Sequence, residues 1–253
     1  MSETFRETLS SLATAQKGAA RSAPAYSRFV NRRLGRVFAA IAVRLDLTPN
    51  EVTAVSACAT FAGIALVALV APGWWLAVGV CALLVVGYAL DSADGQVARA
   101  THTGSPSGEW LDHMVDATKI STMPLAVAVG LYRFTDVPHV WLLIPLVNAV
   151  AGAVYFFGMI LTEQLRRAHG VTSQAPAGAA GNLRSLLVLP TDYGVLCLAF
   201  VLWALPVTFL VAYGLITLAT LGATMLASRK WFRDMRALAP AAPPGEPGSS
   251  NPS

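Results

Sequence analysis

The chain has 253 residues, with 18 lysines and arginines against 14 aspartates and glutamates, for a formal net charge of +4. Hydrophobic residues make up 55% of the sequence and charged residues only 13%, about half the roughly 25% that is usual in soluble domains. This composition argues against an ordinary soluble domain, so the positions of the apolar residues decide the class of protein.

The first element predicted in chain order is an amphipathic helix within a cytoplasmic N-terminal segment, residues 1–47. Between residues 26 and 45 apolar residues recur at helical spacing, opposite a face that carries Arg28, Arg32 and Arg36. A basic amphipathic helix beside a membrane span is expected to lie against anionic lipid headgroups. The alternative is a soluble helix packed on a cytoplasmic domain. Thr48 and Pro49 suit the N-cap and the first position of the next helix.

Six stretches with few or no charged residues follow, and each predicts a membrane-spanning helix. They are residues 52–71, 74–90, 120–132, 137–162, 186–205 and 207–227. The third is long enough to cross a bilayer, which takes about 20 residues, only if its helix begins before Asp112. The fifth is interrupted only by Asp192. The predicted fold is therefore an all-α polytopic membrane domain of six helices at residues 48–230, followed by a disordered cytoplasmic tail at residues 231–253, which is rich in Pro, Gly and Ser.

The basic residues predict how the chain is oriented in the membrane. Every lysine and arginine except Arg133 falls in the N-terminal segment, in the C-terminal segment or in the connections after the second and fourth spans. Connections that carry such an excess of positive charge face the cytoplasm. The rule therefore predicts a multi-pass cell-membrane protein with both termini, and the connection after the second span, on the cytoplasmic side.

Carboxylates are concentrated around that connection. Asp91 and Asp94 are three residues apart at the end of the second span, and Asp112 and Asp116 are four apart where the third helix begins. Either spacing puts both side chains on one face of a helix. Two antiparallel helices can therefore point four carboxylates at one another.

Four neighbouring anions at a membrane edge repel one another unless protonation, basic partners or cations neutralise them. Arg99 and Lys119 are the basic residues at hand. Oxygen ligands favour magnesium, manganese or calcium over zinc, and two such ions form a clamp that suits phosphoryl chemistry. The alternatives are a helix end with ordinary surface aspartates, or a cation or proton transporter that uses intramembrane carboxylates.

Eight residues of this region resemble, in type and spacing, the signature of the CDP-alcohol phosphotransferase family, also called the CDP-alcohol phosphatidyltransferase family. They are Asp91, Asp94, Gly95, Ala98, Arg99, Gly108, Asp112 and Asp116. The resemblance implies a membrane enzyme of phospholipid biosynthesis. Such an enzyme moves a phosphatidyl or related phospho-alcohol group from a CDP-linked donor, here expected to be CDP-diacylglycerol, to an acceptor alcohol and releases CMP.

The resemblance also implies roles for single residues. Asp91 and Asp112 are expected to bridge two divalent cations, Mg²⁺ or Mn²⁺. Asp94 is expected to complete one metal site, and Asp116 to complete the other and to act as the general base. The residues expected to surround the CDP moiety are Asn50, Glu51, Val52, Thr53, Gly95, Arg99 and Ser105. The resemblance further implies a homodimer in contact with membrane lipids, and we expect no nucleic-acid partner.

The acceptor alcohol stays open between glycerol 3-phosphate, inositol phosphate, serine and others. Several members of the family have a basic residue directly after the fourth aspartate, but Ala117 stands there in this chain, which argues against a glycerol-phosphate or inositol-phosphate acceptor. Asp192 is interpreted either as functional or as part of a helix interruption, and neither His102 nor His113 is expected to be a ligand. Four basic residues have two possible interpretations: they hold an acidic acceptor, or they only set the topology and bind lipid headgroups. They are Lys119, Arg166, Arg167 and Arg184.

Overall fold

The computed structural model describes residue 12 and residues 24–171 and 191–238, and every regular element in these parts is a helix. The all-α prediction is therefore confirmed. In chain order the elements are η1 (Ser27–Asn31), α2 (Arg32–Arg44), α3 (Pro49–Leu69), α4 (Trp74–Thr101), α5 (Pro106–Phe134), η2 (His139–Leu142), α6 (Leu143–Ala168), α8 (Tyr193–Ala199), η4 (Phe200–Ala204) and α9 (Pro206–Arg236).

Five helical stretches of the described residues are long and apolar enough to cross a membrane: α3, α4, α5, η2 with α6, and α9. The fifth predicted span is described only from residue 191, and that part forms the shorter apolar helix Tyr193–Ala204. The prediction of a polytopic membrane protein is thus confirmed. Residues 186–190 of the same predicted span lie outside the described residues.

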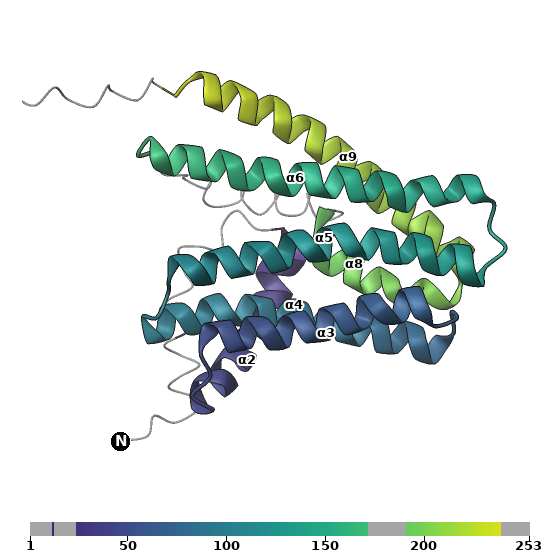
Figure 1. The fold of residues 1–253 in the computed structure, drawn as a ribbon, viewed down its shortest axis with the longest axis horizontal. Coiled ribbons are helices and arrows are strands. Elements are labelled where there is room, and N and C mark those ends of the chain that lie inside the picture. Colours follow the sequence, from purple (N-terminus) through teal and green to yellow (C-terminus); the bar gives the residue numbers. More distant parts are fainter. Residues whose placement is uncertain (1–11, 13–23, 172–190, 239–253) are drawn as a thin grey trace, which may run out of the picture.

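The long helices lie roughly along the longest axis of the molecule, which is horizontal in Figure 1. The N-terminal ends of α3 and α5 and the C-terminal ends of α4, α6 and α9 lie at one end of the bundle, together with α2 (Figure 1). The third predicted span begins at Pro106 and therefore includes Asp112 and Asp116, as its length required. All four aspartates of the signature consequently lie toward this end.

The C-terminal boundary differs from the predicted one. The tail was expected to begin at residue 231, but α9 continues to Arg236. Lys230 and Arg166 both bind the Asp234 carboxylate, each at 2.7 Å, so an i,i+4 pair and a contact with α6 support this last stretch of helix. Residues 239–253 of the predicted tail lie outside the described residues.

Helix α2 lies on α4 through small side chains and turns large apolar ones outward. Gly35, Ala39 and Ala40 are buried, and a Cβ atom at Gly35 would lie 2.9 Å from the Ala89 carbonyl oxygen. On the other face Val37 and Ile41 are exposed. An outward apolar face agrees with the predicted position at the membrane interface, because a helix surrounded by water would expose this surface at a cost.

Close packing of α3 on α4 fixes how these two helices present their polar ends. The Ser56 hydroxyl donates a 2.8 Å hydrogen bond to the Gly87 carbonyl oxygen. A Cβ atom at Gly87 would lie 2.2 Å from Thr60 Oγ1 and 3.2 Å from the Thr60 backbone nitrogen. Small residues at such crossings let membrane helices approach closely. Thr53, one turn before Ser56, is thereby brought against Asp94 of α4 (Thr53 Oγ1 to Asp94 Oδ2, 2.6 Å).

Asp192 has a structural role in the described residues. It is the N-cap of α8, where its Oδ1 accepts a 3.0 Å hydrogen bond from the Gly194 backbone N–H. Its Oδ2 accepts a 2.8 Å bond from the Ser27 backbone N–H, which ties the start of η1 to the start of α8. Asp192 is buried, so the loss of its carboxylate leaves two backbone donors without this partner.

We therefore expect Asp192→Ala to lower the free energy of unfolding by about 1–3 kcal/mol. Asp192→Asn is expected to lie between this variant and the wild type, because its amide oxygen still accepts one hydrogen bond. Thermal unfolding of the purified protein in detergent measures both changes. The matched control is Asp136→Ala, since Asp136 is exposed between α5 and η2. Equal unfolding temperatures for all four proteins would contradict the structural role.

Candidate metal and substrate site

A short reversal of the chain places the two pairs of aspartates at the same end of the bundle. Helix α4 ends at Thr101, and the next residue, His102, adopts a left-handed conformation with φ 56°. Helix α5 starts after Ser105, whose side chain accepts a 3.1 Å hydrogen bond from the Gly108 backbone N–H, and Pro106 occupies the first turn. These stop and start signals are the reason that the signature spans two helices with only a few residues between them.

A cavity of about 930 Å³ opens between the polar ends of α3, α4 and α5. Its lining includes Asp94 and Asp112 of the predicted metal site. It also includes five of the residues expected to surround the CDP moiety: Asn50, Thr53, Gly95, Arg99 and Ser105. Residues from three different helices thus lie around one space.

Glu51 and Val52, the other two residues expected near CDP, are not among the residues that line the cavity. Glu51 Oε2 accepts a 2.7 Å hydrogen bond from the Thr48 backbone N–H, and the Glu51 backbone N–H donates a 3.3 Å bond to Thr48 Oγ1. This pair is a capping box that starts α3. Val52 is buried and packs in one cluster with Ala39 and Val97.

Two glycines of the signature lie beside the cavity, and an added side chain would be tight at Gly108 but not at Gly95. A Cβ atom at Gly108 would lie 3.2 Å from Asn50 Oδ1 and 3.3 Å from Ser105 Oγ, so this glycine lets α3 and the start of α5 meet. A Cβ atom at Gly95 would lie 3.4 Å from a guanidinium nitrogen of Arg99. Gly95 therefore keeps open the space directly in front of Arg99.

Asp91 and Asp116 both form an ion pair with Lys119. Lys119 Nζ lies 2.5 Å from Asp91 Oδ1 and 2.7 Å from Asp116 Oδ1. Neither aspartate is among the residues that line the cavity, whereas Asp94 and Asp112 are. The sequence suggested Lys119 as a local counter-charge or as a partner for the acceptor, and the structure places it between two of the predicted metal ligands.

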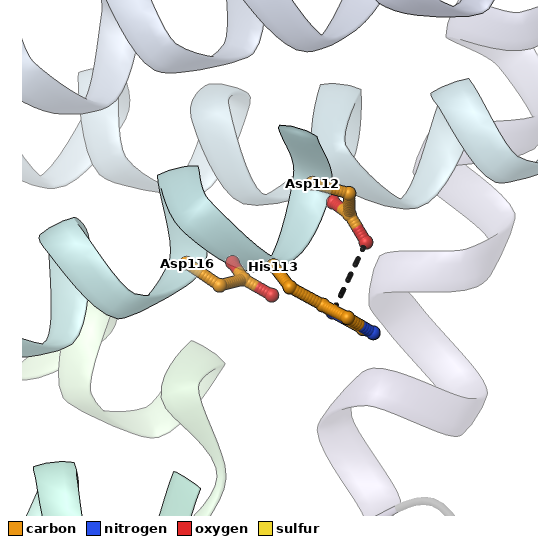
Figure 2. A group of neighbouring side chains, drawn as sticks. All are labelled: Asp112, His113 and Asp116. Carbon is orange, nitrogen blue, oxygen red and sulfur yellow. Dashed lines mark ion pairs between the residues drawn. The ribbon is translucent and has the colours of Figure 1, made fainter. Parts of the chain in front are cut away.

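The donor set fits a divalent cation. Asp112, His113 and Asp116 each offer one ligand atom, and these atoms all lie within 4.8 Å of one another (Figure 2). The His113 ring lies to one side of the two carboxylates, with Nδ1 4.0 Å from Asp112 Oδ2. Carboxylate oxygens suit Mg²⁺ and Mn²⁺, and an imidazole nitrogen is compatible with Mn²⁺. The sequence did not predict a ligand at His113, because only its adjacency to Asp112 pointed to it.

The two other basic candidates within the described residues are engaged in ion pairs. Arg166 binds Asp234 at 2.7 Å. Arg167 binds Glu109 at 2.7 Å, and Glu109 lines the cavity, so this pair joins α6 to the edge of the site. Arg184 lies outside the described residues. These contacts favour a role for both described arginines in helix packing over direct capture of an acidic acceptor.

Comparison with known proteins agrees with the site. A sequence model of one family, described as CDP-alcohol phosphatidyltransferase, matches residues 46–226. The match runs from just before α3 into α9 and so covers both pairs of aspartates and most of the chain. No individual curated protein shows a significant match. Members of the family are transferases of substituted phosphate groups and use divalent cations. From the match and the site together, the chain belongs to the CDP-alcohol phosphatidyltransferase family.

Proposed function

We propose that this membrane transferase moves a phosphatidyl group from CDP-diacylglycerol to a small alcohol or phospho-alcohol acceptor in phospholipid biosynthesis and releases CMP. Membership of the family supports transfer of a phospho-alcohol group from a CDP-alcohol. The observation that carries the proposal is the placement of six of the eight signature residues around one cavity at the polar end of a membrane bundle. The same observation favours the transferase over the transporter alternative, since the cavity offers room for a nucleotide beside the carboxylates.

The cavity residues are suited to the CDP part of the donor. Asn50 and Ser105 offer polar groups on either side of Gly108. Arg99 is exposed and forms no ion pair within the described part of the chain, so its guanidinium is available for the diphosphate. Guanidinium groups bind phosphate oxygens through pairs of charge-assisted hydrogen bonds. Gly95 leaves the approach to this group open.

Two divalent cations, Mg²⁺ or Mn²⁺, would be held by Asp91, Asp94, Asp112 and Asp116. When bound, such ions neutralise the diphosphate and the charge that develops on it during transfer. Asp94 already has one oxygen held by Thr53 Oγ1 at 2.6 Å, which fixes its orientation toward the cavity. Asp112 also lines the cavity, from the opposite helix.

Asp116 is the proposed general base. In the proposed step its carboxylate takes the proton of the acceptor hydroxyl while the hydroxyl oxygen attacks the β-phosphorus of the donor. The bond from that phosphorus to the bridging oxygen breaks, and CMP leaves with that oxygen. The acceptor thereby gains the phosphatidyl group. One phosphoester bond forms while one phosphoanhydride bond breaks, so the step needs no oxidant or reductant.

The membrane placement of the site follows from the same proposal. Acyl chains of the donor would stay in the bilayer while its nucleotide enters the cavity at the helix ends. The concentration of lysine and arginine at this end supports a cytoplasmic site with both termini on the same side. We also propose the homodimer that the resemblance implied.

The test is CMP release by the purified protein in lipid with CDP-diacylglycerol, Mg²⁺ or Mn²⁺, and a panel of acceptors that includes glycerol 3-phosphate, inositol phosphate and serine. We expect release that requires the metal and one class of acceptor. Release with a different CDP-alcohol, but not with CDP-diacylglycerol, would overturn the choice of donor and keep the reaction. Metal-dependent ion flux without CMP release would overturn the reaction itself.

Removal of the Arg99 charge gives a second expectation for the same assay. Arg99→Gln is expected to raise the KM for the CDP-linked donor by about 10- to 100-fold, because a charge-assisted bond to a phosphate contributes about 1.5–3 kcal/mol. Arg99→Lys is expected to recover part of this loss, since it keeps the charge but not the forked geometry. Arg233→Gln, at an exposed position near the end of α9, is the matched control. An unchanged KM in Arg99→Gln would place the diphosphate elsewhere.

A further inference from the structure

Lys119 is the one lysine or arginine among the described residues that is buried, with 3% of its surface exposed. It comes from α5, one turn after Asp116, and it reaches across to Asp91 of α4. Its ammonium group is within hydrogen-bonding distance of one oxygen of each aspartate, Oδ1 in both cases. The lysine therefore joins the two helices that carry the signature.

A buried ammonium group is costly unless it is paired, and so is a pair of neighbouring carboxylates without a counter-charge. Lys119 removes both costs at once, because each of its partners lies within 2.7 Å. The other lysine of the described residues, Lys230, behaves differently, because it is half exposed and pairs with Asp234 of its own helix. The burial and the two ion pairs of Lys119 thus indicate that it is part of the carboxylate centre, and not a residue whose charge only sets the membrane topology.

We propose that Lys119 is the permanent counter-cation of the carboxylate centre and positions Asp91 and Asp116 for their work. Its ammonium group holds one oxygen of each aspartate and leaves the other oxygen of each free to face a divalent cation or the acceptor. The positive charge also weakens the binding of divalent cations to the same carboxylates. The part of this inference that concerns the acceptor rests on the proposed function, whereas the part that concerns cation binding does not.

This arrangement has a consequence for Asp116. Because Oδ1 is bound to Lys119, the proton of the acceptor is taken by Oδ2. It also has a consequence for charge. Two divalent cations offset the charge of four carboxylates, so the Lys119 ammonium leaves the loaded centre with one excess positive charge. A positive centre attracts the diphosphate of the donor, which a neutral one would not.

The experiment compares Mn²⁺ binding to wild-type protein, Lys119→Met, Lys119→Gln and Lys119→Arg in detergent, by electron paramagnetic resonance of free Mn²⁺. Lys119→Met and Lys119→Gln are expected to bind Mn²⁺ at least about ten-fold more tightly, because a positive charge a few ångströms from the ion has been removed. Lys119→Arg is expected to stay within about three-fold of the wild type. Lys230→Met, the same substitution outside the centre, is the control and is expected to bind like the wild type.

A purely structural role for Lys119 would loosen Mn²⁺ binding in the two neutral variants or leave it unchanged, and either result overturns the proposal. If Lys119→Met does not fold, Lys119→Gln decides, since its amide still donates hydrogen bonds without a charge. Mn²⁺ binding requires no turnover, so it separates this inference from the proposed reaction. Wild-type protein that releases no CMP, beside neutral variants that bind Mn²⁺ more tightly, would refute the reaction and support the counter-cation.

Discussion

Asp116→Asn is expected to leave a folded protein whose rate of CMP release is below about one thousandth of the wild-type rate. An amide cannot accept the proton of the attacking hydroxyl, and general base catalysis alone contributes about 10²- to 10⁴-fold. The same substitution removes a negative ligand from the proposed metal centre, which adds to the loss. Lys119 keeps Asp91 as a partner at 2.5 Å, so the contact between α4 and α5 persists.

The measurement is the rate of CMP release with saturating donor and acceptor, together with thermal unfolding to show that the variant is folded. Asp136→Asn, at an exposed position between α5 and η2, makes the same chemical change away from the site and is expected to keep the wild-type rate. Turnover by Asp116→Asn within ten-fold of the wild type would assign the base to another residue. Asp112 would then be tested next, because its carboxylate lines the cavity.

A large effect on stability is expected from Gly87→Ala. The new Cβ atom would lie 2.2 Å from Thr60 Oγ1 and 3.2 Å from the Thr60 backbone nitrogen. Rotation of the Thr60 side chain relieves the first overlap, but only separation of α3 and α4 relieves the second. Overpacking of this kind costs about 1–3 kcal/mol, and we expect the upper end of this range because a helix must move. The hydrogen bond from Ser56 to the Gly87 carbonyl would be strained as well.

Gly79→Ala is the matched control for Gly87→Ala, because Gly79 lies on the same helix and a Cβ atom there meets nothing within 4 Å. It is expected to leave stability unchanged or to raise it by up to about 1 kcal/mol, as alanine favours a helix over glycine. Thermal unfolding in detergent and in lipid compares the two variants. If Gly87→Ala were as stable as Gly79→Ala, the close crossing of α3 and α4 would be wrong.

Most of the fold was predictable because membrane helices leave a simple pattern in the sequence. Long uncharged stretches identified α3, α4, α6 and α9, and the need for length correctly extended α5 back through Asp112. The end of α9 was misplaced, because the ion pairs of Asp234 with Lys230 and Arg166 depend partly on a helix distant in sequence. The fifth span is described only in part.

The candidate site was predictable as a list of residues, but not as an arrangement. Spacing along a helix shows which carboxylates share a face, and so it indicated the two aspartate pairs. Spacing does not show which residue of a neighbouring helix a side chain contacts. The position of Lys119 between Asp91 and Asp116 therefore came only from the structure. The sequence likewise did not show that Glu51 and Val52 lie outside the lining of the cavity, since adjacent residues of a helix point in different directions.

The first turns of α3 limit how freely the proposed donor site can be altered. Glu51 starts the helix, Val52 fills the packing against α2 and α4, and Thr53 orients Asp94, so three consecutive positions serve three separate demands. Attempts to broaden donor specificity by random exchange along this stretch will mostly lower the stability of the protein. Asn50 lines the same cavity from an exposed position, and a library built on this residue will sample new specificities at a much lower cost in folding.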